Sequence, residues 1–144
     1  MTTEPQHTAD SVDMSWAVNK LTQEKGVVSA LLFSSDGLVL AASDNLAREA
    51  AERAAAAFAG VKSLQADLAA FCGAAEENLP LRHVVTDLKT RTVLLFAAGE
   101  RTGVGVSVEG DSTGQEAAVA ITATLKMING LRPVLEARER TTAP

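Results

Sequence analysis

The chain has 144 residues, a formal net charge of −5 and hydrophobic residues at 47% of its positions. This composition is typical of one globular domain and unlike that of a disordered chain. Proteins that bind nucleic acid use a basic face or aromatic stacking platforms, so the acidic balance and the 3% aromatic content argue against that class.

The first expected helix follows a polar stretch at residues 1–10, which we expect to be a flexible tail. Apolar side chains then recur at the spacing of one helical face, at Met14, Ala17, Val18 and Leu21. Gly26 is expected to end this helix.

Two apolar runs flank Asp36-Gly37 and predict a β-hairpin. The first run, residues 27–33, is almost unbroken, whereas a strand with one face in water would alternate. We therefore expect this strand to be covered on both faces. Residues 38–42 form the returning strand.

A long alanine-rich helix is expected over about residues 46–72, and it carries two apolar tracks. The main track can face the sheet, and it contains Leu46, Ala50, Ala54, Ala57, Val61, Leu64, Leu68 and Phe71. The second track has too little polarity for a solvated face and predicts contact with a partner helix; it contains Ala47, Ala51, Ala55, Phe58, Ala59, Ala66 and Ala69. The alternative is that alanine is abundant only because it is the best helix former.

Three more strands and a final helix complete the pattern. Residues 81–88 carry polar side chains that indicate a sheet edge, and residues 92–98 form another covered strand. In the last strand Gly103 and Gly105 alternate with valines, so a helix can approach one bare face. The final helix begins after Ser112, and we expect an end or kink near Gly130 and Pro133 and then a charged tail.

This order, αββαβββα, predicts an α/β (α+β) fold with one five-stranded antiparallel sheet. The long central helix would cover one face, and the N- and C-terminal helices would cover the other. The domain is expected at residues 11–140, with residues 141–144 as a second flexible tail.

The sequence carries no motif that we would assign to catalysis. A GxxxxGK[ST] phosphate-binding loop is absent, and the spacing of the two histidines and Cys72 does not fit a zinc site. Arg82, Arg91 and Arg101 are candidates for an arginine finger, although ordinary solvated arginines are the simpler interpretation. We therefore expect no cofactor, no metal and no enzymatic activity.

The expected location is the cytoplasm. No stretch has the pattern of a signal peptide, and the apolar runs are too short to cross a bilayer, so we expect no membrane insertion. A single cysteine is also consistent with a reducing compartment.

Residues 26–43, GVVSALLFSSDGLVLAAS, resemble the opening hairpin of the Roadblock / dynein light-chain domain family. The resemblance continues through the alanine-rich helix and the strands at 82–87 and 92–98, and it covers about residues 12–131. It is closest to bacterial stand-alone members that are encoded beside a small Ras-like GTPase.

The resemblance implies a profilin-like/Roadblock fold and a non-catalytic adaptor. Such a protein would form a homodimer through the central helix and the third strand, with two sheets joined edge to edge. It would bind and regulate a small Ras-like GTPase in trans, as an activating protein or a stimulator of exchange, within a signalling complex. A sensor-kinase-like protein of the same system is a further candidate partner. Matched by position, the implied interface residues are Ala51, Ala55, Phe58, Lys62, Ala66, His83, Val85 and Asp87.

A small-molecule sensor domain of the PAS or GAF type is the alternative. It would need a cavity with polar groups, and the bare strand face at Gly103, Gly105 and Ser107 could leave one.

Overall fold

The structure is a computed structural model that describes residues 14–63 and 68–142. Residues 14–21 form a helix that carries no label in the figures. The labelled elements are β1 (Val27–Ser34), β2 (Val39–Ala42), α2 (Arg48–Ser63), β3 (His83–Asp87), β4 (Arg91–Ala97), β5 (Thr102–Glu109) and α4 (Gln115–Thr142).

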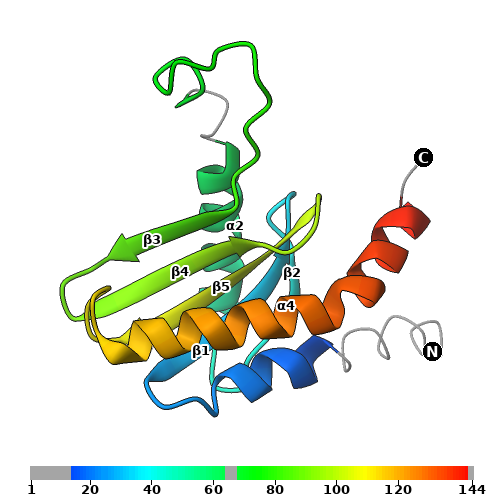
Figure 1. The fold of residues 1–144 in the computed structure, drawn as a ribbon. Helices are drawn as coiled ribbons and strands as arrows, with labels where there is room; N and C mark the ends of the chain where they lie inside the picture. Colours follow the sequence, from blue (N-terminus) through cyan, green and yellow to red (C-terminus); the bar gives the residue numbers. More distant parts are fainter. Residues whose placement is uncertain (1–13, 64–67, 143–144) are drawn as a thin grey trace.

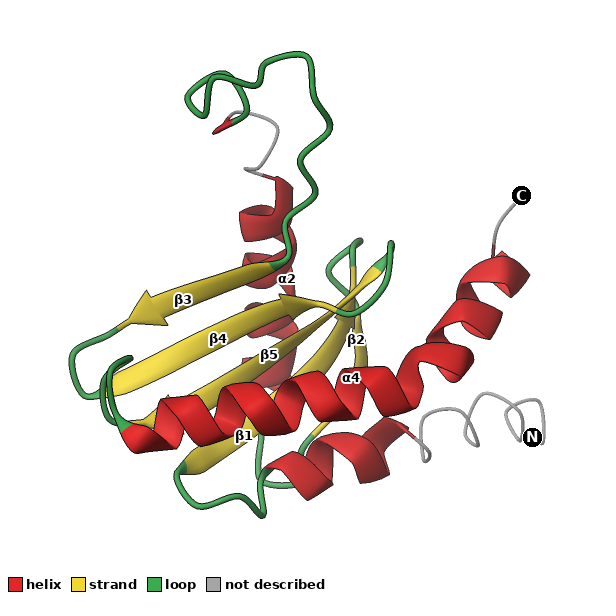
Figure 2. Cartoon of the chain, viewed as in Figure 1, coloured by secondary structure: helices red, strands yellow, loops and turns green. Residues whose placement is uncertain are grey.

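The strands form one antiparallel sheet in the order β2-β1-β5-β4-β3, so that β2 and β3 are its edges (Figure 1). Helix α2 covers one face, and α4 and the helix at 14–21 lie side by side on the other (Figure 2). The predicted αββαβββα order, the sheet and the distribution of helices are therefore confirmed.

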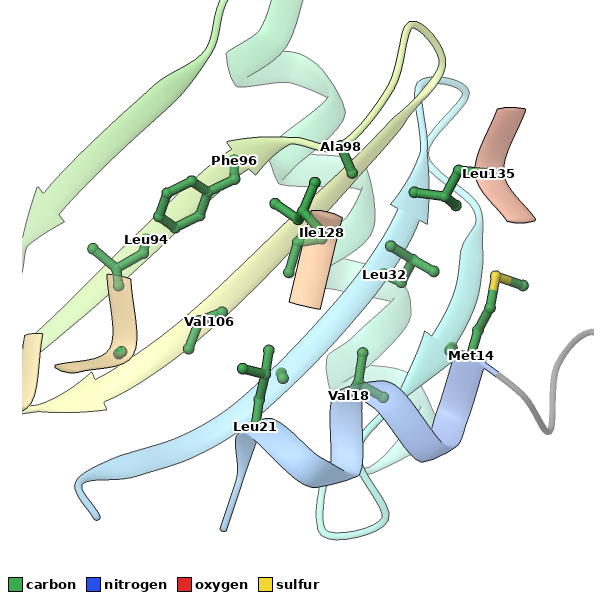
Figure 3. Packing of buried hydrophobic residues seen from close by; sticks show 14 of the residues in the cluster. Met14, Val18, Leu21, Leu32, Leu94, Phe96, Ala98, Val106, Ile128 and Leu135 are labelled. Atoms are coloured by element: carbon green, nitrogen blue, oxygen red, sulfur yellow. The ribbon is translucent and has the colours of Figure 1, made fainter. Parts of the chain in front are cut away.

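The face under α4 holds the larger part of the core (Figure 3). Val18 and Leu21 of the first helix pack with Leu32 of β1, while Ile128 of α4 lies over the β4 residue Phe96. In β1 the buried side chains alternate between this cluster and the one under α2. The prediction that this unbroken apolar strand is covered on both faces is confirmed.

Two glycines of β5 determine how closely side chains can lie under α2. A Cβ at Gly103 would collide with the ring of Phe33, and a Cβ at Gly105 would collide with the ring of Phe58. The two rings contact each other at a centroid distance of 5.3 Å. The bare strand face expected from the sequence is thus filled by aromatic rings, and no cavity for a sensor ligand forms there.

The assignment of the two tracks of α2 was only partly right, because Leu46, Ala54 and Val61 of the expected sheet-facing track do pack against the sheet. Ala51 and Ala55 are fully buried against the sheet, whereas Ala50 and Ala57 of the expected sheet-facing track are exposed. Alanine surrounds this helix on every side, so its sequence offers little contrast between faces. The fit of Phe58 against Gly105 instead sets the rotation of the helix. Residues 69–73 form turns, so the helix does not continue to Cys72 as expected.

The final helix has the kink expected near Gly130 and Pro133, but it does not end there. Helix α4 continues through Gly130 and Pro133 to Thr142, and it changes direction in its last third (Figure 1). Proline removes one helical hydrogen bond and crowds the preceding turn, which explains a bend. The expected charged tail after Pro133 and the first two residues of the expected tail at 141–144 are helical. The tail expected at residues 1–10 lies outside the described residues.

We predict that Gly105→Ala lowers the free energy of unfolding by about 1–3 kcal/mol, because the new methyl group displaces the Phe58 ring from a packed position. Urea unfolding followed by circular dichroism measures this loss.

The matched control is Gly130→Ala in α4, where an added Cβ would meet no atom within 4 Å. This change should be neutral or should raise stability by up to about 1 kcal/mol, because alanine restricts the unfolded chain more than glycine does. Equal stability of the two variants would contradict the proposed role of the Gly105 position.

Candidate functional site

The outer edge of β3 presents backbone groups that no other described strand uses. The Ala97 amide donates to the Arg82 carbonyl, and the Leu88 amide donates to the Arg91 carbonyl. In an antiparallel pair of strands, every second residue directs its N–H and C=O groups toward the neighbouring strand. Since Arg82 and Leu88 bond to β4, Val84 and Thr86 also direct these groups toward β4. The N–H and C=O groups of His83, Val85 and Asp87 therefore point away from the sheet.

The side chains of these same three residues lie on the face that α4 covers. The register places His83 beside Phe96, Val85 beside Leu94, and Asp87 beside Thr92. The His83 ring stacks on the Phe96 ring at a centroid distance of 4.2 Å and an angle of 13°. Burial of one ring face lowers the pKa of His83, because desolvation disfavours the charged imidazolium. Val85 is 44% exposed, which is unusual for a valine in the middle of a strand.

Asp87 connects the end of β3 to the segment before α4. Its carboxylate accepts hydrogen bonds from the Ser112 amide at 3.2 Å, the Ser112 hydroxyl at 2.9 Å and the Lys89 amide at 3.0 Å. These donors, the Ser112 amide first, lower the pKa of Asp87. The two bonds from Ser112 hold the β3–β4 turn against the segment before α4, and the bond from Lys89 stabilises the turn itself, so this carboxylate has a structural role.

The outer face of α2 carries a row of exposed residues at the spacing i, i+3, i+7 and i+10. The row contains Ala50, Arg53, Ala57 and Gly60. A Cβ at Gly60 would meet no atom within 4 Å, so nothing in the described chain requires glycine there. Glycine inside a helix costs about 0.5–1 kcal/mol relative to alanine. A second backbone that approaches this face would account for that cost.

The structure distributes the interface residues predicted from the sequence over different environments. Ala51 and Ala55 are buried within the chain and offer no surface to a partner, and Phe58 is half-buried against Phe33. Lys62 lies in α2 and its side chain is outside the described part, as is the whole of Ala66.

His83, Val85 and Asp87 do lie together, on one strand at the free edge of the sheet. The sequence analysis missed the exposed row on α2. The signal in the sequence that could have located this row is Gly60, because a glycine inside an alanine-rich helix is not explained by a turn.

The described residues show neither a metal site nor a membrane span. No group of three or more His, Cys, Asp or Glu side chains in residues 14–63 and 68–142 is arranged to hold a metal ion. Among the same residues, no helix combines the length and the apolar character that crossing a membrane requires.

Comparison with known protein families gives a match to the Roadblock/LC7 domain over residues 15–107. These residues span the first helix through most of β5, and so they include the whole sheet edge and α2. No curated protein matches the chain significantly.

Solved structures with the same fold include three bacterial proteins. A Roadblock/LC7 domain from Streptomyces avermitilis has 27% identity and a TM-score of 0.72, covering 85% of this chain and 97% of that one. MglB from Myxococcus xanthus has 15% identity and a TM-score of 0.74, covering 95% of each chain. The gliding protein MglB from Thermus thermophilus has 19% identity and a TM-score of 0.71, covering 92% of this chain and 93% of that one.

Asp87→Asn should lower stability at neutral pH, because the amide accepts the three hydrogen bonds less strongly than the carboxylate does. The lowered pKa of Asp87 stabilises the fold above the ordinary aspartate pKa of about 4. That contribution is lost as the pH falls from there through the pKa of the folded chain. The difference between wild type and variant should therefore shrink with acidification, as measured by urea unfolding at a series of pH values.

The control for this prediction is Asp36→Asn, which makes the same chemical change at an exposed turn position distant from Ser112. A loss of stability in Asp87→Asn that stays constant from neutral to strongly acidic pH would contradict the role of the carboxylate.

Proposed function

The chain belongs to the Roadblock/LC7 domain family, and on this premise we propose that it is a non-catalytic, homodimeric adaptor that binds and regulates a small Ras-like GTPase in trans. The observation that carries the proposal is the coincidence of this family match with two exposed surfaces, the outer edge of β3 and the row on α2. The proposed setting is a cytoplasmic signalling complex, in which a sensor-kinase-like protein is a further candidate partner.

Pairing of two β3 edges would satisfy the outward backbone groups. An antiparallel pair centred on Val85 matches Val85 with its own copy and His83 with Asp87 of the partner subunit. Each of these residues directs its N–H and C=O outward, so every matched pair can exchange two hydrogen bonds. One twofold axis then joins two five-stranded sheets edge to edge.

The face of α2 that would join this contact differs from the one inferred from the sequence. Ala51 and Ala55 are buried in the chain, so the contact falls to Ala50, Ala57 and Gly60. Small side chains allow two helices to approach closely. The open space at Gly60 supports an approach of this kind.

Regulation in trans is supported by the family match and by the absence of a nucleotide-binding motif from the sequence. A phosphate-binding GxxxxGK[ST] loop is absent from all 144 residues, so the nucleotide belongs to the partner. A continuous surface from two copies offers a GTPase a larger platform than one copy does. We propose that binding at this platform alters either the hydrolysis or the exchange of the bound nucleotide.

Val85→Pro should weaken self-association, since proline removes an outward amide from each copy while the bonds to β4 remain. The loss of two intermolecular hydrogen bonds corresponds to roughly tenfold to a hundredfold in the dimer dissociation constant. Sedimentation velocity over a concentration series measures this change. Val85→Thr, which keeps the amide, is the matched control and should remain dimeric.

Gly60→Leu tests the same dimer on α2. The added side chain has open space in the single chain, so it should leave the fold intact and obstruct only a second helix. A wild-type chain that stays monomeric at all concentrations, or a dimer that neither Val85→Pro nor Gly60→Leu weakens, would overturn this mode of association.

The GTPase proposal has its own test. The wild-type chain is titrated into a Ras-like GTPase from the same genomic neighbourhood, loaded with GDP or with a non-hydrolysable GTP analogue, and binding is followed by calorimetry. We expect tighter binding of one nucleotide state and a changed rate of hydrolysis or exchange. Absence of binding in both states would overturn the regulatory role, whether or not the chain is dimeric.

A further inference from the structure

A groove lies between α4 and the end of the sheet where β3 begins and β4 ends. Its volume is about 1190 Å³, which exceeds the roughly 300–1,000 Å³ typical of small-molecule pockets. Its walls come from α4, from the β4–β5 turn at residues 99–101 and from Arg82 and His83. The groove is separate from the outer face of α2, which lies on the opposite side of the sheet (Figure 2).

The bend of α4 shapes this groove. Ile121, Leu125 and Ile128 line it from the part of the helix before Pro133, and Leu135 and Glu136 line it from the part after. Figure 1 shows that the helix first crosses the sheet and then turns beside the β4–β5 hairpin. A straight helix would lie along only one side, so the bend gives the groove two walls.

The floor of the groove is apolar. Phe96, Ile128 and Leu135 form buried parts of it, and Figure 3 shows the Phe96 ring beside Ile128. Leu125 on the helical wall is 48% exposed, so an apolar surface continues from the floor to the rim. A partner that covers Leu125 and the half-buried Ile121 gains free energy by removing their apolar surface from water.

The rim is more basic than the protein as a whole. Arg82 of the segment before β3, Arg101 of the β4–β5 turn and Arg132 of α4 line the groove with only two carboxylates, Glu100 and Glu136. Three positive and two negative charges give a formal +1, whereas the chain carries −5. Among the side chains that the structure describes, none forms an ion pair with Arg82 or Arg132. The charge of these two arginines is therefore available to a ligand.

We propose that this groove binds an acidic, amphipathic peptide segment of a partner protein. Apolar side chains of the segment lie on the exposed Leu125 and the half-buried Ile121 of α4, and its carboxylates pair with Arg82 and Arg132 at the rim. Charge complementarity selects an acidic partner. The concave, apolar floor suits a peptide better than a flat membrane surface, and the acidic chain as a whole is repelled by anionic lipid. The proposal does not depend on self-association or on the GTPase.

The test begins with a random peptide library displayed on phage and selected on the immobilised wild-type chain. Selected peptides are synthesised with a fluorescent label, and their dissociation constants are measured by anisotropy. We expect the selected sequences to combine apolar residues with Asp or Glu and to bind less tightly as salt is added. Failure to select any such peptide would count against the proposal.

Two variants test whether the selected peptides bind in the groove. Arg132→Glu places a negative charge at the rim, which repels the carboxylates of the peptide, and should weaken binding by about tenfold or more. Leu125→Asp removes apolar surface from the wall and should have a similar effect. Arg91→Glu, which makes the same charge change at an exposed site outside the groove, is the matched control and should bind like the wild type. Circular dichroism melting of each variant confirms that the fold is retained.

Several outcomes would overturn the proposal. Peptides that bind Arg132→Glu and Leu125→Asp as tightly as the wild type would place the binding elsewhere. Selected peptides that are basic would contradict the charge argument. Sedimentation with vesicles of phosphatidylglycerol and phosphatidylcholine tests the other anionic partner. Binding to these vesicles that Arg132→Glu abolishes, with no peptide bound, would assign the groove to lipid.

Discussion

The close contact between α2 and the middle of the sheet is the constraint on which the other features depend. Two glycines in the central strand β5 leave space that the rings of Phe33 and Phe58 fill. This contact fixes the rotation of an otherwise uniform alanine helix. It buries Ala51 and Ala55, and it turns Ala50, Ala57 and Gly60 outward. The surface available to a partner is thus determined from inside the fold.

The sheet edge depends on a second, polar constraint. Asp87 fastens the β3–β4 turn to the segment before α4, which keeps the short strand β3 in place although it has only one neighbour. The strand consequently keeps a straight row of outward backbone groups at His83, Val85 and Asp87. Exposed edge strands can pair with another chain, which is why this edge carries the dimer contact in the proposed function.

The sequence predicted the order of elements and the sheet well, because unbroken apolar runs and the Asp36-Gly37 turn are strong local signals. It also placed β3 at an edge from its polar residues. It could not orient α2, because alanines on every side of the helix reduce the periodic contrast between its faces. The sequence left open whether α4 ends or kinks near Pro133. Packing of Leu135 against the core holds the helix together where local preference would end it, so the kink is what forms. The groove depends on that bend and had no sequence signal of its own.

One residue belongs to both sides of the edge strand. The backbone of His83 points outward from the sheet, while its ring stacks on Phe96 and lines the groove beside α4. If occupancy of one region alters affinity at the other through this shared residue, thermodynamic reciprocity makes the two effects equal in size. A single histidine could in this way transmit information between two neighbouring partners without any rearrangement of the fold.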